Sequence, residues 1–99
     1  MLQYKYEPEK NRIAVFQEGG KEVGEVTYFD HPDCWIANHT YVDPSMRGQN
    51  IAAELVKRLI NLAREHGKAI YPTCSYVVKV MERTPEYQDV LYEKDQSKM

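Results

Sequence analysis

The spacing of apolar residues changes once along this chain, and that change determines its fold class. Over residues 51–66 the apolar positions recur every three or four residues, which predicts an amphipathic helix with one buried face. Asn50 precedes this helix as a favourable N-cap residue, and Gly67 follows it as a stop signal. Before it, short segments rich in β-forming residues alternate with turn residues. The sequence therefore predicts an α+β protein.

The first half is predicted to form an antiparallel β-meander of three strands. Residues 12–17 form the first strand, and residues 22–29 return after the turn at 18–21, whose paired glycines suit a tight reversal. After a second turn at 30–33, residues 34–42 form the third strand. Strict alternation in this strand gives two faces, one with Trp35, Ala37, His39 and Tyr41 and the other with Ile36, Asn38, Thr40 and Val42.

The elements after the main helix have weaker signals. Residues 68–72 are predicted to form a short strand that ends at Pro72, and a strand directly after a helix indicates parallel pairing with an earlier strand. Residues 75–83 fit two structures. Their β-branched residues favour a strand, whereas the spacing of Val77, Val80 and Met81 favours a helix.

The C-terminal segment is short and increasingly polar. Thr84 and Pro85 indicate the start of a last short helix over residues 85–92, because proline is favoured at the first helical position. Residues 93–99 are expected to be a frayed tail. With 99 residues, the chain is predicted to form a single domain over residues 1–99.

Charge is unevenly distributed along the sequence. The first 43 residues carry eight acidic and four basic side chains, whereas residues 44–85 carry three acidic and seven basic ones. The formal net charge of −2 argues against a nucleic acid or membrane partner. No segment approaches the roughly 18 consecutive apolar residues of a membrane helix, and residues 1–5 lack a signal-peptide core. A cytoplasmic protein is therefore expected, with an anionic ligand on its basic middle.

The cysteines and histidines do not form a metal motif. Cys34 and Cys74 lack CxxC spacing and are expected to be free thiols in a reducing compartment. A metal site from His31, Asp33, Cys34 and His39 would match no standard ligand spacing, so no metal is expected.

Residues 42–52 carry the strongest functional signal. A strand leads through a turn into the N-terminus of the longest helix, whose first N–H groups and dipole suit phosphate oxygens. Arg47 adds a cation and Gly48 permits a close approach to the backbone. These residues alone leave two interpretations open, an ordinary capped helix or an anion site.

This segment resembles the acetyl-CoA-binding signature of the GCN5-related N-acetyltransferases (GNATs). That signature has Arg or Gln, two variable residues, Gly, one variable residue, and Gly or Ala. Arg47 fills the first place and Ala52 the last, while Asn50 stands where the signature has glycine. Asparagine tolerates a positive φ better than most residues, but its side chain can also intrude on a bound pyrophosphate.

Two flanking motifs extend the resemblance to about residues 12–91. Asn38-His39-Thr40 precedes the signature, and Tyr71-Pro72-Thr73-Cys74-Ser75-Tyr76 follows the helix. Together they are similar to a small GNAT-like subfamily with a His-Thr strand and a Pro-x-Cys-Ser-Tyr motif. The resemblance implies the GNAT fold: a β-meander, the main helix, a further parallel strand and short C-terminal helices.

The resemblance also implies acetyl-CoA, or coenzyme A, as the cofactor. Its pantetheine arm would bind backbone groups around Tyr41 and Val42, and its thioester would lie near Cys74 and His39, the candidate catalytic residues. Tyr76 is a candidate donor to the departing thiolate. The pyrophosphate would bind the helix start, which comprises Arg47, Gly48, Gln49, Asn50, Ile51 and Ala52.

Each of these chemical roles has a structural alternative. Cys74 fits a nucleophile or an inert packing residue, and His39 fits a general base or a strand histidine with a cross-strand partner. Tyr76 fits a cofactor contact or a core aromatic.

The implied function is acetyl transfer from acetyl-CoA to an amine, carried by a small molecule or by a protein. Larger GNATs place helices between their first two strands, over the acceptor site, where this sequence has only the turn at 18–21. The acceptor side is then open, or closed by another subunit, which favours a bulky or protein-borne amine. The alternatives are a non-catalytic CoA-binding or acyl-CoA-binding module and an interaction domain.

Overall fold

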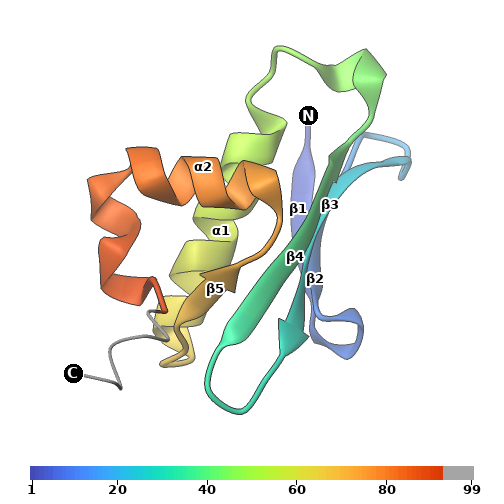
Figure 1. Cartoon of the computed structure of the whole chain (residues 1–99). Coiled ribbons are helices and arrows are strands. Elements are labelled where there is room, and N and C mark those ends of the chain that lie inside the picture. Colours follow the sequence, from blue (N-terminus) through green and yellow to red (C-terminus); the bar gives the residue numbers. More distant parts are fainter. Residues whose placement is uncertain (93–99) are drawn as a thin grey trace, which may run out of the picture.

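A five-stranded sheet with helices packed against one side forms the framework of the chain (Figure 1). The computed structural model describes residues 1–92, and the tail predicted over residues 93–99 lies outside them. In chain order the elements are β1 Gln3–Glu7, η1 Pro8–Lys10, β2 Arg12–Phe16, β3 Glu22–Asp30, β4 Trp35–Val42, η2 Pro44–Met46, α1 Ile51–Glu65, β5 Ile70–Pro72, α2 Ser75–Arg83 and η3 Pro85–Val90, where η marks a 3-10 helix.

The strands lie in the order β1-β2-β3-β4-β5, and only the last pair is parallel. The predicted meander is confirmed as β2, β3 and β4, and the predicted parallel strand is confirmed as β5. Because α1 connects β4 to β5, its N-terminus follows directly on the end of β4. The predicted α+β architecture is therefore confirmed.

β1 is a strand beyond the predicted meander. It pairs antiparallel with β2 from Gln3↔Phe16 to Glu7↔Arg12. Its sequence signal is the alternation of two tyrosines with polar residues, and these tyrosines pack against the core. The first two strands are therefore β1 and β2, joined by Pro8–Lys10, while the turn at 18–21 joins β2 to β3. The short connection between the first two strands is therefore at residues 8–10, ten residues before the turn at 18–21 that the sequence predicted for it.

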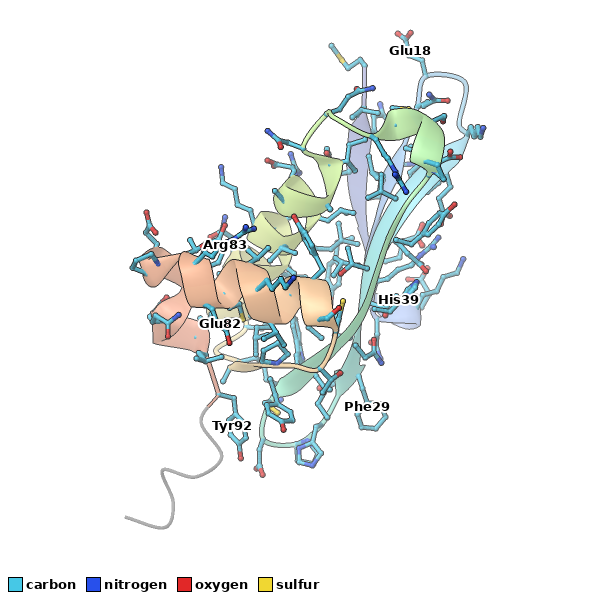
Figure 2. All side chains as sticks on the ribbon, turned by 45° about the horizontal axis from the view of Figure 1, so that its top comes forward. Glu18, Phe29, His39, Glu82, Arg83 and Tyr92 are labelled. Carbon is cyan, nitrogen blue, oxygen red and sulfur yellow. The ribbon has the colours of Figure 1, made fainter. Side chains whose placement is uncertain are left out.

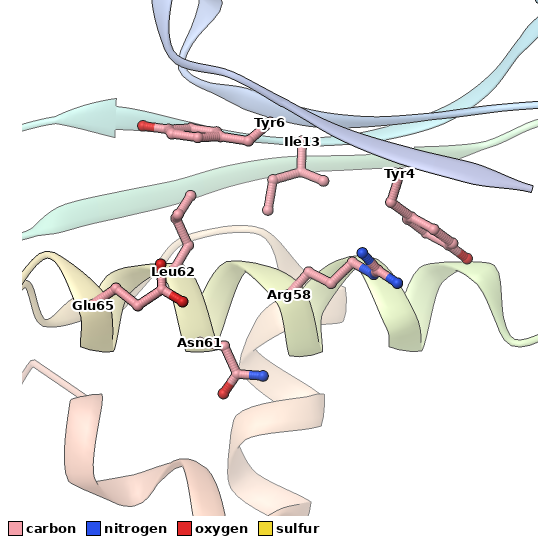
Figure 3. Close-up of a pocket in the computed structure, with 7 residues that line it drawn as sticks. All are labelled: Tyr4, Tyr6, Ile13, Arg58, Asn61, Leu62 and Glu65. Carbon is pink, nitrogen blue, oxygen red and sulfur yellow. The ribbon is translucent and has the colours of Figure 1, made fainter.

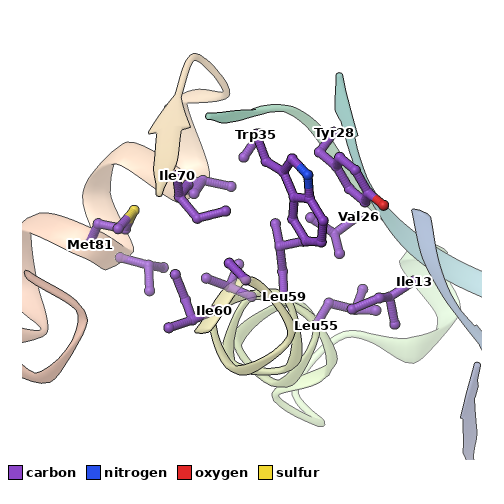
Figure 4. Close-up of a cluster of buried hydrophobic side chains, with 14 of the residues drawn as sticks. Ile13, Val26, Tyr28, Trp35, Leu55, Leu59, Ile60, Ile70 and Met81 are labelled. Carbon is purple, nitrogen blue, oxygen red and sulfur yellow. The ribbon is translucent and has the colours of Figure 1, made fainter. Parts of the chain in front are cut away.

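The core lies between the sheet and α1. Leu55, Leu59 and Ile60 of α1 face the sheet and are fully buried (Figure 4). Gly24 on β3 allows the neighbouring strand β4 to pass closely, because a Cβ there would lie 2.8 Å from the Tyr41 carbonyl oxygen. The buried face of α1 matches the predicted stripe and consists of Ile51, Leu55, Val56, Leu59, Ile60 and Ala63.

The segment with two predicted structures is the helix α2. Val77, Val80 and Met81 are its buried residues, at the helical spacing read from the sequence. β5 ends at Pro72, which has no N–H for further pairing, so the β-branched residues after it have no adjacent strand. Tertiary packing therefore overrides their strand propensity.

The last predicted helix is a shorter 3-10 helix, η3, and it ends at Val90 rather than at residue 92. Thr84 occupies its N-cap position but makes no side-chain capping hydrogen bond. The chain then turns back along β5, where the Tyr92 N–H donates to the Ile70 carbonyl at 2.8 Å. This sheet contact ends the helix before residue 92.

A β-bulge interrupts β4 at Asn38. Ala37 pairs with Tyr28 and His39 pairs with Thr27, so Asn38 is an extra residue on β4. Because side chains alternate with a period of two, one extra residue reverses the face of every residue that follows it.

This bulge corrects the predicted faces of β4. Strict alternation places His39 and Tyr41 with the buried start of the strand, but both are exposed on the face without helices. Thr40 and Val42 instead turn toward the helices, where Thr40 contacts Cys74 and Val42 packs against the core. The sequence motif Asn38-His39-Thr40 therefore presents its threonine, not its histidine, to α2.

Candidate functional site

A cavity of about 260 Å³ opens at the N-terminus of α1. Seven of the nine residues predicted to bind the cofactor line it, while Tyr41 and Gln49 do not. Met46 and Ala53 complete its wall, although neither was among the predicted residues. The seven predicted residues are Val42, Arg47, Gly48, Asn50, Ile51, Ala52 and Tyr76.

The loop before α1 is fixed by several hydrogen bonds. The Asp43 carboxylate accepts from the N–H and the hydroxyl of Ser45, both at 2.9 Å, and these bonds lower the pKa of Asp43. The Asp43 N–H donates to the Val23 carbonyl at 2.8 Å. The Gln17 side-chain amide donates to the Met46 sulfur at 3.2 Å, from the β2–β3 hairpin. The loop is therefore held against β3 and the hairpin.

Two residues of this loop have left-handed backbone conformations. Gly48 has φ +85° with open space beside its Cα, and Asn50 has φ 56°. Asn50 occupies the predicted N-cap position of α1, and its carbonyl accepts from the Glu54 N–H at 3.0 Å. Its side chain makes no capping hydrogen bond. The first-turn N–H groups of α1 are thus not covered by the Asn50 side chain.

The edge of β4 separates from β5 beyond Ala37. The last pair between the two strands is Ala37↔Pro72, and the N–H groups of Thr73 and Cys74 then donate to the Ala37 carbonyl at 2.9 and 3.1 Å. Beyond this point α2, rather than a strand, lies beside β4 (Figure 1).

The alternation of β4 decides which of its backbone groups face this separation. The Tyr41 carbonyl points toward Gly24 on β3, because a Cβ added at Gly24 would lie 2.8 Å from the Tyr41 oxygen. Thr40 and Val42 alternate with Tyr41, so their backbone groups face α2 instead. These two residues lie about 7 Å apart along the strand. The predicted contact around Tyr41 and Val42 is therefore available from Val42 and not from Tyr41.

Cys74 is half-buried at the N-cap position of α2. Its Sγ lies 3.6 Å from the Thr40 Oγ1, across the end of β5. Burial by itself raises the pKa of this thiol, but the Val77 N–H, the Thr40 hydroxyl and the Tyr76 N–H favour the thiolate. The net effect is a pKa below the ordinary value for cysteine. A thiol with a lowered pKa therefore lies where β4, β5 and α2 meet.

His39 lies apart from this junction, on the other side of the sheet (Figure 2). Its Nε2 is 3.5 Å from a Glu25 carboxylate oxygen, and its side chain is 54% exposed. The same face carries Arg12, whose guanidinium contacts Glu25, Glu22 and Glu7 at 2.7–3.0 Å. The structure therefore does not bring the two predicted catalytic side chains together on one face.

A second cavity, of about 290 Å³, lies between β1 and α1 (Figure 3). The Arg58 guanidinium covers the Tyr4 ring at 4.2 Å and also donates to Glu54. Its lining contains none of the predicted site residues and consists of Tyr4, Tyr6, Ile13, Arg58, Asn61, Leu62 and Glu65. This cavity is distinct from the one at the start of α1.

Two further properties concern the chain over residues 1–92. No group of three or more His, Cys, Asp or Glu side chains there is arranged to hold a metal ion. Nor does any helix within that range have the length and apolar character needed to cross a membrane. His31 accepts from the Asp33 N–H, and His66 lies beside the Trp35 ring.

Comparison with known proteins agrees with this geometry. A family model described as GCN5-related N-acetyl-transferase matches residues 12–90. The solution structure of a GCN5-like protein from Staphylococcus aureus is 26% identical, covers 91% of this chain and 87% of its own, and has a TM-score of 0.73. No curated protein is significantly similar in sequence.

Two larger acetyltransferases share the fold over part of their length. The ribosomal-protein-alanine N-acetyltransferase of Brucella melitensis is 22% identical, with a TM-score of 0.56 over 88% of this chain and 65% of its own. An aminoglycoside 6'-N-acetyltransferase complexed with coenzyme A is 26% identical, with a TM-score of 0.52 over 63% of this chain and 37% of its own.

The cavity at α1 fits the diphosphate of coenzyme A. Uncapped N–H groups at a helix start, an adjacent arginine and open space at Gly48 are the donor set that binds phosphate oxygens. Acetyl-CoA is accordingly the cofactor. With the family model spanning most of the sequence and the fold in agreement, the chain belongs to the GCN5-related N-acetyltransferase family of acyltransferases.

Proposed function

We propose that the chain transfers the acetyl group of acetyl-CoA to an amine at the junction of β4, β5 and α2. We also infer that it belongs to the small GNAT subfamily with the Pro-x-Cys-Ser-Tyr motif, which Pro72, Cys74, Ser75 and Tyr76 match. The observation that carries the proposal is the cavity at α1, which gathers residues of β4, the loop, α1 and α2 around one anion site.

The residues of the cavity have separate roles in binding. Arg47 and the first-turn N–H groups of α1 hold the diphosphate, and the backbone of Val42 holds an amide of the pantetheine arm. Acetyl-CoA supplies the activated acetyl group as a thioester. Burial raises the pKa of Tyr76, so its hydroxyl stays protonated at neutral pH and can donate to the departing thiolate.

Cys74 allows either of two routes. In the two-step route its Sγ forms a bond to the acetyl carbon while coenzyme A leaves as its thiol. The amine then takes the acetyl group, loses one proton and restores Cys74. In the direct route the amine takes the acetyl group from the thioester, and Cys74 only lines the site. The lowered pKa of Cys74 favours the two-step route, because the thiolate is the nucleophilic form.

The acceptor amine is proposed to reach this junction from the face that carries His39. Within residues 1–92 no α-helix covers that face, because β1 is connected to β2 by the short 3-10 helix Pro8–Lys10. Phe29 and Tyr41 are 57% and 49% exposed there. Glu22 and Glu25 share the single cation of Arg12, whereas Glu7 also pairs with Lys10, so the carboxylates of Glu22 and Glu25 are the ones that can attract a cationic amine. His39 lies on the amine's side of the sheet and Cys74 on the other, so any proton that His39 accepts leaves the amine before the amine reaches Cys74.

The role of Cys74 can be tested with acetyl-CoA and two variants. Saturation at about a hundred times Kd stabilises a protein by about 2.7 kcal/mol, so we expect the Tm to rise by roughly 10–20 °C. Cys74→Ala should keep this rise and lose at least about 99% of acetyl transfer, measured as CoA release with an amine. Mass spectrometry should detect acetyl-Cys74 during turnover of the unmodified chain.

Other results of the Tm and CoA-release measurements would each support a different function. Full transfer by Cys74→Ala, without acetyl-Cys74 in the unmodified chain, would establish direct transfer. A Tm rise without CoA release from any amine would indicate a binding module. Absence of the rise would contradict the cofactor site itself, and Cys74→Ser serves as the matched control for packing.

The acceptor class gives a separate prediction. Because the face around His39 is open, a lysine-containing protein or peptide should be acetylated at least about tenfold more efficiently than a free polyamine, compared by kcat/KM. The physical reason is that an uncovered face offers area to a large acceptor and no enclosure to a small one. Efficient acetylation of the polyamine alone would contradict this assignment.

A further inference from the structure

The bulge at Asn38 pairs Thr40, rather than the neighbouring His39, with Cys74. Without the extra residue, Thr40 would lie on the face that carries Glu25. With it, the Thr40 Oγ1 lies 3.6 Å from the Cys74 Sγ, and both side chains are partly buried. The Cys74 N–H is already bonded to the Ala37 carbonyl, which fixes the backbone beneath the sulfur.

We propose that Thr40 is the positioning residue for Cys74, and that its hydroxyl holds the sulfur at the junction of β4, β5 and α2 in the thiolate form. The inference rests on the proposed role of Cys74 in acetyl transfer. It places the threonine of the His-Thr pair beside Cys74, where the sequence predicted the histidine.

A hydroxyl is suited to this role because it can both donate and accept. When Cys74 is a thiol, its S–H donates to the Thr40 oxygen. When Cys74 is a thiolate, the hydroxyl turns and donates to the sulfur. A single rotation about the C–O bond therefore serves both protonation states, and no other side chain has to move.

The ionisable groups around Cys74 do not offer a substitute for this donor. Tyr76 on α2 contributes to the pKa of Cys74 through its backbone N–H, and no charged group is among the causes of that shift. The pKa of Cys74 depends on burial and on hydrogen bonds, with Thr40 contributing its only side-chain bond. His39 faces Glu25 on the opposite side of the sheet. The thiolate therefore depends on Thr40 and on the N–H groups around it.

The proposal predicts how fast Cys74 reacts with iodoacetamide as pH changes. The test uses the full chain without acetyl-CoA, and peptide mass spectrometry separates Cys74 from the buried Cys34. Thr40→Val removes the hydroxyl and keeps the shape. Losing a donor to the thiolate raises the pKa, so the midpoint should move up by about one pH unit. At pH 7 the reaction should then be about tenfold slower.

Three further variants keep the test decisive. Thr40→Ser retains the hydroxyl and should restore the original midpoint. Thr84→Val makes the same chemical change at the C-terminal end of α2, the opposite end of the helix from Cys74, and should leave the midpoint unchanged. Thr40→Ala also removes the hydroxyl and replaces Thr40→Val if the valine disturbs folding. The Tm of each variant shows whether it is folded.

An unchanged midpoint in a folded Thr40→Val or Thr40→Ala variant would overturn the proposal, as would an equal shift in Thr84→Val. The proposed function fails on a different observation, full acetyl transfer by Cys74→Ala. If that result appears together with the shifted midpoint, Thr40 stabilises the Cys74 thiolate but Cys74 is not the nucleophile.

Discussion

Replacing Ala52 with glutamate is expected to weaken acetyl-CoA binding by about tenfold to a hundredfold while the fold remains intact. Ala52 lies in the first turn of α1, half-exposed, in the wall of the cavity. A carboxylate there meets the diphosphate at short range and costs roughly 1.5–3 kcal/mol of binding free energy. The same carboxylate interacts favourably with the helix dipole. Stability without ligand should therefore stay constant or rise slightly while affinity falls.

Isothermal titration calorimetry with acetyl-CoA and the Tm without ligand measure these two effects separately. Lys57→Glu is the matched control, because Lys57 is exposed on the same helix and outside the cavity. It changes the net charge by two units rather than one, yet should reduce affinity less than threefold, because its exposed side chain lies outside the cavity, where water and salt weaken its interaction with the diphosphate. Equal losses in both variants would indicate a general charge effect and would contradict the site at α1.

Truncating Leu59 to alanine is expected to reduce the free energy of unfolding by about 3–4 kcal/mol. Leu59 is fully buried on the face of α1 that packs against the sheet (Figure 4). Removing its branched end leaves a cavity that the neighbouring side chains cannot fill completely. A domain of this size has about 5–15 kcal/mol of stability in total. The variant should therefore unfold roughly 12–25 °C lower.

Urea denaturation and thermal unfolding followed by circular dichroism measure this loss. Leu62→Ala is the control, since Leu62 is only half-buried at the rim of the cavity between β1 and α1. It should lose less than half as much stability. A similar loss in both variants would show that the core does not center on the stripe of α1 that faces the sheet.

The elements with a strong local signal were predictable, and those that depend on distant partners were less so. The periodicity of α1 identified its extent to within one residue at the C-terminus, because six buried positions on one face leave no competing structure. Residues 75–83 stayed ambiguous because strand propensity and helical spacing conflict there. Only the end of β5 at Pro72 decides between them.

The candidate site shows the same division. The sequence motif identified most of the cavity lining, since the loop and the first turn of α1 are contiguous in the chain. Met46 and Ala53 were missed, although their places inside the same loop and first turn were the available signal. Tyr41 and Gln49 fall outside the lining for a related reason, because position in a motif does not specify where a side chain points.

By itself, the sequence determined the α+β class, the meander, the amphipathic helix and the turn that leads from the last meander strand into that helix. Each of these follows from residues within a few positions of one another. Only the tertiary structure decided which side chains meet at the junction of β4, β5 and α2. The physical reason is the bulge at Asn38, an irregularity in pairing with β3 that reverses the faces of His39 and Thr40. A pairing register depends on two strands at once, so alternation within one strand cannot reveal it.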